Sequence, residues 1–356
     1  MAREDMRKVE LVVMDREVLS GITTLLDDEG IDFAVSDHSD GGDAALVVFM
    51  VPANAVEPIQ DRIDGALDDM GVGNDTYTVV SDPEAVVSPR LDVREQYGNM
   101  GAEGPERISR DELHSTAADM LPDGTIYGIL TAIAAVVATS GVLLGSMSVL
   151  VGSMVIAPLI GPPMATSVST VLDDQRLFTR AAKLQVVGIG LAIVTALIFA
   201  LFVKQTALVP NAEVTQNLQL NNYAQPTLLL ITVAVGSGVA GAISLATSGE
   251  VELVGVMMAA ALVPPMGVMG VAIAWSQPTA ALGSGAVVLV NLLSINLGAT
   301  ISLWYLGYHP RGWTDLRDTR STILKRVLVL IGMIGSLAVV LSSLAGHGGL
   351  TRLMGV

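Results

Sequence analysis

The stretch from Ser146 to Val171 constrains the fold of this chain more than any other. Its sequence, SMSVLVGSMVIAPLIGPPMATSVSTV, runs for 26 residues without a charged side chain. A helix of that length crosses a hydrocarbon core of about 30 Å. Pro158, Pro162 and Pro163 stand near its middle, and proline removes a backbone donor and clashes with the preceding helical turn. We therefore predict a membrane-spanning helix that is broken inside the bilayer.

A second segment repeats this arrangement later in the chain. Residues 254–266 (VGVMMAAALVPPM) echo residues 151–164 (VGSMVIAPLIGPPM), with one residue of slippage between the two alignments. Pro264 and Pro265 would interrupt this span as well. Broken backbone at membrane depth is tolerated only where it is buried in protein or lines a wet cavity. The echo therefore predicts an internal repeat with two helix breaks that face each other.

The charges divide the chain into two parts. Residues 1–123 contain 28 acidic and 9 basic side chains, a net charge of −19, whereas residues 124–356 contain 7 and 10, a net charge of +3. This division predicts an acidic soluble module followed by a membrane domain. A solvated acidic surface, typical of a salty cytoplasm, is the main interpretation, and a surface for cations or a basic partner is the alternative. Nucleic acid is excluded as a partner because its phosphates would be repelled.

The chain lacks the residues and motifs that several classes of chemistry require. The chain has no cysteine, which excludes disulfides, thiolate catalysis and cysteine-ligated zinc. No Walker loop, HExxH motif or nucleophile elbow occurs, and the histidines have no metal-ligand spacing. We therefore expect no enzyme activity, no cofactor and no metal. The N-terminus lacks the apolar run of a signal peptide, so we expect the first module to stay in the cytoplasm.

Residues 1–82 predict an α+β domain. Apolar runs indicate strands at 9–14, 31–36, 44–51 and 76–80, and apolar residues spaced three or four apart indicate helices at 15–29 and 52–70. The order βαββαβ is that of the ferredoxin-like fold. This fold serves many functions, so both a small-ligand sensor and an assembly or gating domain stay open.

Residues 83–123 predict a linker that ends in a short amphipathic helix. Ser109 stands three residues before Glu112, which is a capping pattern. Leu113, Ala117 and Met120 form the apolar face. The helix either lies on the bilayer surface or packs on the soluble module.

The transmembrane domain is expected at 124–345. Seven spans are predicted, at about 124–143, 146–171, 184–203, 228–247, 252–275, 279–305 and 326–345. The connections after spans two and six carry eight Lys and Arg residues, and the opposite side carries only Lys204 and Arg352. This distribution predicts a multi-pass cell-membrane protein with a cytoplasmic N-terminus and an external tail at 346–356. The loop at 205–226 would then be external.

Three spans separate each predicted break from its twin. An odd offset turns the second copy upside down, so spans one to three and four to six would form an inverted 3+3 repeat, with span seven at the periphery. The ATSG sequence at 138–141 and again at 246–249 supports this repeat. Such repeats with discontinuous helices are typical of secondary transporters, whose site lies at the midplane. Glycine-rich faces predict close helix packing and a homo-oligomer; they contain Gly141, Gly145, Gly236, Gly238 and Gly241.

A family resemblance follows from these motifs. The run IAPLIGPPM at 156–164, the pair Asp173 and Asp174, and LVPPM at 262–266 resemble the domain-of-unknown-function family 389. Its members are hydrophobic proteins of archaea and bacteria with an N-terminal soluble module. The resemblance covers most of residues 1–345 and implies a polytopic membrane protein of undefined activity, with no active-site residues to carry over. The acidic bias is similar to that of haloarchaeal proteins.

The two breaks supply the first candidate site residues. Unpaired carbonyls can coordinate a cation, and half-helix N-termini favour an anion; alternatively the breaks are structural kinks satisfied by neighbouring helices. Hydroxyls in span two either line a path or serve as packing contacts between helices. The candidates in these two groups are Ser153, Ala157, Pro158, Gly161, Pro162, Pro163, Thr166, Pro264 and Pro265.

Polar residues of spans five and six supply the rest. Asn291 and Ser294 share a helix face, and an amide at membrane depth requires a partner or a wet cavity. Glu250 and Glu252 at the start of span five either cap the helix or carry a coupling proton or sodium ion.

These features predict a secondary transporter or ion-conducting protein, with lipid as its surroundings. The scarcity of buried charge favours a small ion or a neutral solute as the substrate. The alternative is a membrane-anchored sensor or scaffold whose cytoplasmic domain binds a ligand or partner. Transport requires a polar path that reaches the breaks. In a scaffold, the breaks would be dry and fully packed.

Overall fold

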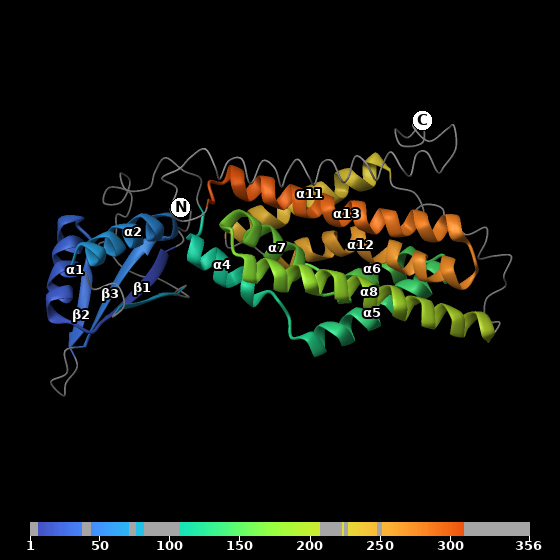
Figure 1. Ribbon diagram of the computed structural model, residues 1–356, viewed down its shortest axis with the longest axis horizontal. Coiled ribbons are helices and arrows are strands. Elements are labelled where there is room, and N and C mark those ends of the chain that lie inside the picture. The colour runs from blue at the N-terminus through green and yellow to red at the C-terminus, as the bar shows by residue number, and fades with distance from the viewer. Residues whose placement is uncertain are drawn as a thin grey trace. The chain divides into compact units, whose positions relative to one another are not determined.

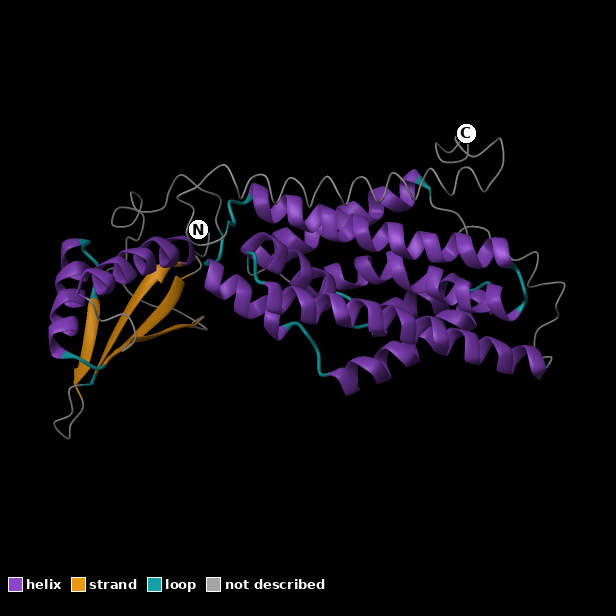
Figure 2. Cartoon of the chain, viewed as in Figure 1, coloured by secondary structure: helices purple, strands orange, loops and turns teal. Residues whose placement is uncertain are grey.

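The computed structural model describes residues 6–37, 44–70, 76–81, 107–206, 223, 227–247 and 251–309. The chain divides into two compact units, Met1–Glu112 and Leu113–Val356. The first unit contains the strands, and the second consists of helices (Figures 1 and 2). The division falls inside the segment 83–123 that the sequence assigned to a linker and a short helix.

The first unit contains a four-stranded antiparallel sheet. Its strand order is β2-β3-β1-β4, with β1 paired to both β3 and β4. The predicted order βαββαβ is confirmed, with bounds within a few residues of those expected. The elements are β1 (Met6–Val13), α1 (Arg16–Asp28), β2 (Phe33–Asp37), β3 (Ala45–Pro52), α2 (Ala53–Met70) and β4 (Thr76–Ser81).

The core of this unit follows from the two sequence periods. Alternate residues of β1 and β3 are buried, because successive side chains of a strand point to opposite faces. Apolar residues of α1 and α2 spaced three or four apart cover this face, among them Ile22 and Ile59. Asp15 begins α1 by accepting a hydrogen bond from Glu17 N at 2.7 Å, and Gly30 follows its end with φ 68°.

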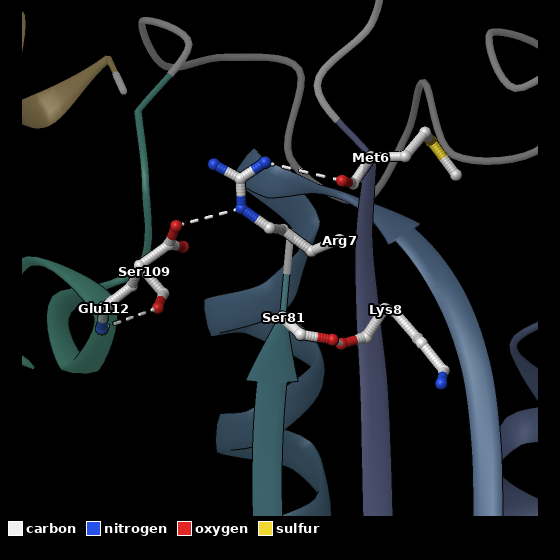
Figure 3. Close-up of polar contacts among 6 residues, drawn as sticks. All are labelled: Met6, Arg7, Lys8, Ser81, Ser109 and Glu112. Carbon is white, nitrogen blue, oxygen red and sulfur yellow. Dashed lines mark hydrogen bonds and ion pairs between the residues drawn. The ribbon is translucent and has the colours of Figure 1, made fainter. Parts of the chain in front are cut away.

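A buried arginine lies at the edge of this unit. Arg7 on β1 is 1% exposed, and its Nε donates to Glu112 Oε1 at 2.9 Å (Figure 3). Its Nη1 also donates to the carbonyl of Met6 at 3.4 Å. Glu112 lies in the first turn of α4 (Arg110–Asp119), where its backbone N–H donates to Ser109 Oγ at 3.2 Å. The predicted capping by Ser109 is therefore confirmed.

The second unit contains the apolar helices. Among the described residues, five helices are long and apolar enough to cross a membrane, and α6 with α7 forms a sixth span if the bent pair is counted as one. Six predicted spans therefore have their counterparts, and the seventh, at 326–345, lies outside the described residues. The helices are α5 (Gly124–Leu144), α6 (Met147–Ile156), α7 (Gly161–Leu172), α8 (Gln175–Gln205), α11 (Leu228–Ala246), α12 (Val251–Ala274) and α13 (Pro278–Tyr305).

The break in the second span is confirmed. Helices α6 and α7 meet at an angle of 54°. Ala157 is extended, with φ −71° and ψ 119°, because the residue before a proline is driven out of the helical region. Pro162 and Pro163 then stand in the first turn of α7, where a missing N–H costs no hydrogen bond.

The predicted break in the fifth span is wrong. Helix α12 continues through Pro264 and Pro265. Two differences from the first copy explain this: Ala261 stands where Pro158 stands, and Gly161 has no counterpart. The carbonyl of Ala261, which Pro265 leaves without its helical partner, instead accepts a hydrogen bond from Asn291 Nδ2 at 2.7 Å.

Helix α8 begins nine residues before the predicted span at 184–203. Asp174 caps it by accepting from Arg176 N at 2.8 Å and Leu177 N at 3.1 Å, so the helix extends past the apolar segment and includes the basic residues predicted for a loop. At the other end of α8, Lys204 Nζ donates to Ala274 O at 2.7 Å and covers the C-terminus of α12.

The glycines have two different roles. Gly238 and Gly298 bring α11 and α13 together, since a Cβ at these positions would lie 2.2 Å from the carbonyl oxygen of Ile295 and 2.5 Å from that of Val235. Gly145, by contrast, ends α5 in a left-handed conformation with φ 62°. The predicted packing role is therefore supported for Gly238 and Gly241 on α11, not supported for Gly236, which has nothing within 4 Å of its Cβ, and wrong for Gly145, which is a helix cap.

Candidate functional site

A cavity of about 670 Å³ lies within the second unit, between α7, α8 and α13; most of its residues have polar side chains, but its accessible wall is largely apolar. Its walls combine hydroxyl and amide side chains with a few apolar ones. Acidic residues lie at the α7–α8 connection. The lining residues are Thr166, Ser167, Ser169, Thr170, Asp173, Asp174, Gln175, Phe178, Thr179, Ala182, Gln185, Leu293, Asn296 and Thr300.

Hydrogen bonds between three helices form the inner end of this cavity. Gln185 Nε2 on α8 donates to Thr166 Oγ1 on α7 at 3.1 Å and lies 3.4 Å from Asn296 Oδ1 on α13. Ser167 Oγ donates to the backbone carbonyl of Asn296 at 3.4 Å. All four residues are buried. A buried amide is stable only when its polar atoms are paired, so this cluster fixes the three helices in register.

The acidic end of the cavity lies where α7 meets α8. Asp173 ends α7 in a left-handed conformation with φ 60°, and Asp174 caps α8. His114 Nε2 on α4 is 2.8 Å from Asp174 Oδ2. This hydrogen bond, followed by those from the Leu177 and Arg176 backbone, holds the pKa of Asp174 below its ordinary value. Asp174 therefore stays ionised and gives this end of the cavity a negative charge.

The cavity reaches to one helical turn from the break. Thr166 Oγ1, at its inner end, also donates to the carbonyl of Pro162 at 2.7 Å. On the side of α12, the break packs against apolar residues. Ala157 and Leu159 share a void of about 10 Å³ with Val263 and Met266 of α12, too small to hold a water comfortably. The break thus faces the proline segment of α12, as the sequence predicted, but through apolar packing.

The predicted site residues do not gather at one place. Thr166 lines the cavity, whereas Ser153 donates to its own helix at Leu150 O, 2.5 Å away. Gly161 is buried where a Cβ would lie 2.0 Å from the carbonyl oxygen of Met120. Pro162 and Pro163 are buried in α7, while Ala157 and Pro158 are partly exposed between α6 and α7.

The candidates on the second half lie elsewhere. Asn291 contacts α12 through Ala261, and neither it nor Ser294 lines the cavity. Glu250 and the side chain of Glu252 lie outside the described residues.

Sequence reasoning missed Gln185 and the His114–Asp174 contact. Gln185 carries an amide within a predicted span. The spans were placed by their lack of charged residues, and that criterion does not detect an uncharged amide. Asn296 is another amide within a predicted span, and no sequence pattern joins it to Thr166. The histidine contact joins residues 60 apart in the chain, and no local pattern predicts it.

Comparison with known proteins adds a family. The family model described as "domain of unknown function" 389 matches residues 154–297, which include the break, α12 and all of the cavity residues except Thr300. An uncharacterized protein of Methanocaldococcus jannaschii is 26% identical over 271 residues, covering 76% of this chain and 80% of that protein. No solved structure matches. Residues 154–297 accordingly match the domain-of-unknown-function family 389, in agreement with the resemblance predicted from the sequence motifs.

Proposed function

We propose that the protein moves a small cation or a neutral polar solute across a membrane. The observation that supports this is the cavity between α7, α8 and α13, helices whose sequences suit a bilayer. Hydroxyl and amide groups inside lipid are costly unless paired or wetted. Those at the inner end of the cavity are paired with one another or with their own helices, so the support for a solute path is the volume of the cavity together with the carboxylates at its other end.

The charges favour a cation over an anion. Asp173 and Asp174 are at one end of the cavity, and the inner end presents the neutral groups of Thr166, Gln185 and Asn296. Acidic groups at a mouth raise the local concentration of cations. Because Asp174 is ionised, an anionic solute would be repelled at this end. A neutral solute could hydrogen-bond to the same hydroxyls and amides.

The proposal includes a seven-span topology with a cytoplasmic N-terminus and an inverted 3+3 repeat. Two observations support the repeat. The proline segments of the two halves share one void, and the residues around them are echoed in sequence. The halves are unequal, since one helix is broken and the other straight. In this arrangement the solute path lies between α7 and α8 of the first half and α13 of the second half, and α12 packs against the break.

One observation favours the alternative of a membrane-anchored scaffold. The break is packed against α12 with a void of only about 10 Å³. In a scaffold, the break would serve packing, and the cavity would be a surface cleft for a lipid or partner.

Flux into proteoliposomes decides between the two. Purified full-length protein is reconstituted, and uptake of ²²Na⁺, ⁸⁶Rb⁺ and radiolabelled glycerol is compared with protein-free vesicles. Transport predicts uptake of at least one probe, reduced at least about tenfold by Gln185→Leu or Asn296→Leu, since each leaves the cluster's polar atoms unpaired. Ser284→Ala is the matched control, because Ser284 Oγ bonds its own helix at Ala280 O. Glu250→Gln tests the predicted coupling role. Uptake no greater than that of empty vesicles for all three probes would contradict transport.

A further inference from the structure

Two unpartnered oxygens lie on one face of α13. Asn291 Oδ1 and Ser294 Oγ are among the few buried side-chain atoms in the described part of the chain that have no hydrogen-bond partner. Asn291 is 1% exposed and Ser294 is 0% exposed. Residues three apart lie side by side on a helix. Buried polar atoms are almost always paired, so two neighbouring exceptions indicate a bound group.

The orientation of the Asn291 amide is fixed by chemistry. Its nitrogen donates to the carbonyl of Ala261 at 2.7 Å, and only the nitrogen of an amide can donate to a carbonyl. The side-chain oxygen is therefore the atom left over. It is held in place by the same hydrogen bond, so it is a positioned acceptor.

Ser294 departs from the other serines of α13. Ser284 and Ser302 turn their hydroxyls onto their own helix, at Ala280 O (2.7 Å) and Gly298 O (2.9 Å). This local bond is the ordinary way to satisfy a hydroxyl at membrane depth. Ser294 does not make it, so its oxygen is available to another ligand.

Helix α12 supplies backbone oxygens beside this face. Pro264 and Pro265 have no N–H, so the carbonyls of Ala260 and Ala261 lose their helical donors. Ala261 is bonded by Asn291 and keeps a second lone pair. The segment thus offers carbonyl, amide and hydroxyl oxygens, all of them neutral.

We propose that Asn291 and Ser294, with the proline-freed carbonyls of α12, bind a dehydrated monovalent alkali cation. Carbonyl and hydroxyl oxygens replace the hydration shell of such an ion. A divalent ion would require carboxylates, and residues 253–305 contain no charged side chain. An anion would require several hydrogen-bond donors. This face instead offers oxygen atoms that have no partner. The site depends on the proposed function in one respect: the bound cation would be the transported ion or a coupling ion.

Thermal unfolding of the purified full chain in detergent tests this binding without any need for transport. Unfolding is followed in NaCl, KCl and choline chloride at equal ionic strength. Binding to the folded state raises the midpoint, by about 5 °C when the ion is near 100 times its dissociation constant. We expect sodium or potassium to raise the midpoint of the wild type relative to choline, and Ser294→Ala to abolish that difference.

Thr131→Val is the matched control. Thr131 Oγ1 is also buried without a partner, but it stands on α5 and has no neighbour of this kind. Both substitutions remove an unpaired hydroxyl, and both leave the acidic surface of the first unit unchanged. Only Ser294→Ala should lose the cation response.

Two outcomes would overturn the site: equal midpoints of the wild type in sodium, potassium and choline, or a cation response that persists in Ser294→Ala. Either would show that Asn291 and Ser294 do not form the site of a cation response. Such a result would leave the flux prediction for Gln185 and Asn296 intact. Conversely, absent flux with an intact cation response would contradict transport and retain the site.

Discussion

The side-chain nitrogen of Asn291 lies 2.7 Å from the carbonyl oxygen of Ala261, and this carbonyl is the one that Pro265 deprives of its helical donor. A side chain thirty residues away in sequence thus replaces a backbone hydrogen bond. This contact explains how two adjacent prolines fit inside a continuous α12 within the membrane-embedded unit.

Removal of the Asn291 amide should destabilise α12. Asn291→Ala leaves a buried carbonyl unpaired, at a cost of roughly 1–3 kcal/mol. Thermal or denaturant unfolding of the purified chain measures it. The decisive comparison is a double-mutant cycle with Pro265→Ala, which restores the missing N–H. In that background Asn291→Ala should cost clearly less, and an equal cost in both backgrounds would contradict the compensation.

A methyl group on Gly238 should separate α11 from α13. A Cβ there would lie 2.2 Å from the carbonyl oxygen of Ile295, and backbone cannot yield as a flexible side chain does. We expect Gly238→Ala to destabilise the protein by about 1–3 kcal/mol, read from the unfolding midpoint. Gly236→Ala is the matched control on the same helix, because nothing lies within 4 Å of its Cβ. Similar effects of the two substitutions would argue against a close crossing.

The His114–Asp174 contact should depend on pH in a defined direction. The pKa of Asp174 is lowered from 3.8, chiefly by the hydrogen bond from His114. A lowered pKa means that the stabilisation is present above 3.8 and is lost as pH falls through the lowered value. Asp174→Asn keeps an oxygen to cap α8 but removes the charge. The difference in stability between wild type and Asp174→Asn should therefore shrink toward zero below pH 3.8.

The control for this titration is Asp123→Asn. Asp123 precedes α5, is exposed and makes no side-chain capping hydrogen bond. Its substitution removes a carboxylate that caps no backbone N–H, so it should change the stability less than Asp174→Asn does at neutral pH. A stability difference for Asp174→Asn that persists unchanged through acid pH would show that charge has no part in the contact.

The buried Arg7 should make Glu112 important to the first unit. Glu112→Ala removes the carboxylate that lies 2.9 Å from the Nε of this guanidinium, which is 1% exposed, and removal of one member of a buried ion pair costs up to about 3 kcal/mol. Lys8→Ala is the control, because the Lys8–Glu10 ion pair is much more exposed and such pairs contribute about 0–1 kcal/mol. Hydrogen exchange of the β1 amides, which form the centre of this sheet, measures both. Equal protection in the two variants would contradict a structural role for the Arg7 pair.

Local sequence patterns predicted the helices, the strands and the first break. The course of α12 and the cavity depend on contacts between residues that are distant in sequence. The alternation of β1 and the prolines of span two were sufficient to place the sheet and the break, because both effects act within a few residues. The straight course of α12 depends on Asn291, and the cavity depends on Thr166, Gln185 and Asn296 meeting from three helices. Gly145 was misinterpreted because it stands four residues after Gly141. A glycine that ends a helix at this position gives the same GxxxG pattern as a glycine that packs against another helix.

Helix α7 has an unusual environment for a membrane segment, since all its residues from Gly161 to Val171 are buried in protein. No side of these residues faces the acyl chains, so α7 has no need of the hydropathy that lets a segment partition into lipid on its own. During biosynthesis it would leave the translocon favourably only once α8 and α13 are there to receive its hydroxyls. Both of those helices are synthesised after α7. We therefore expect α7 to take its place in the domain only after they have been made.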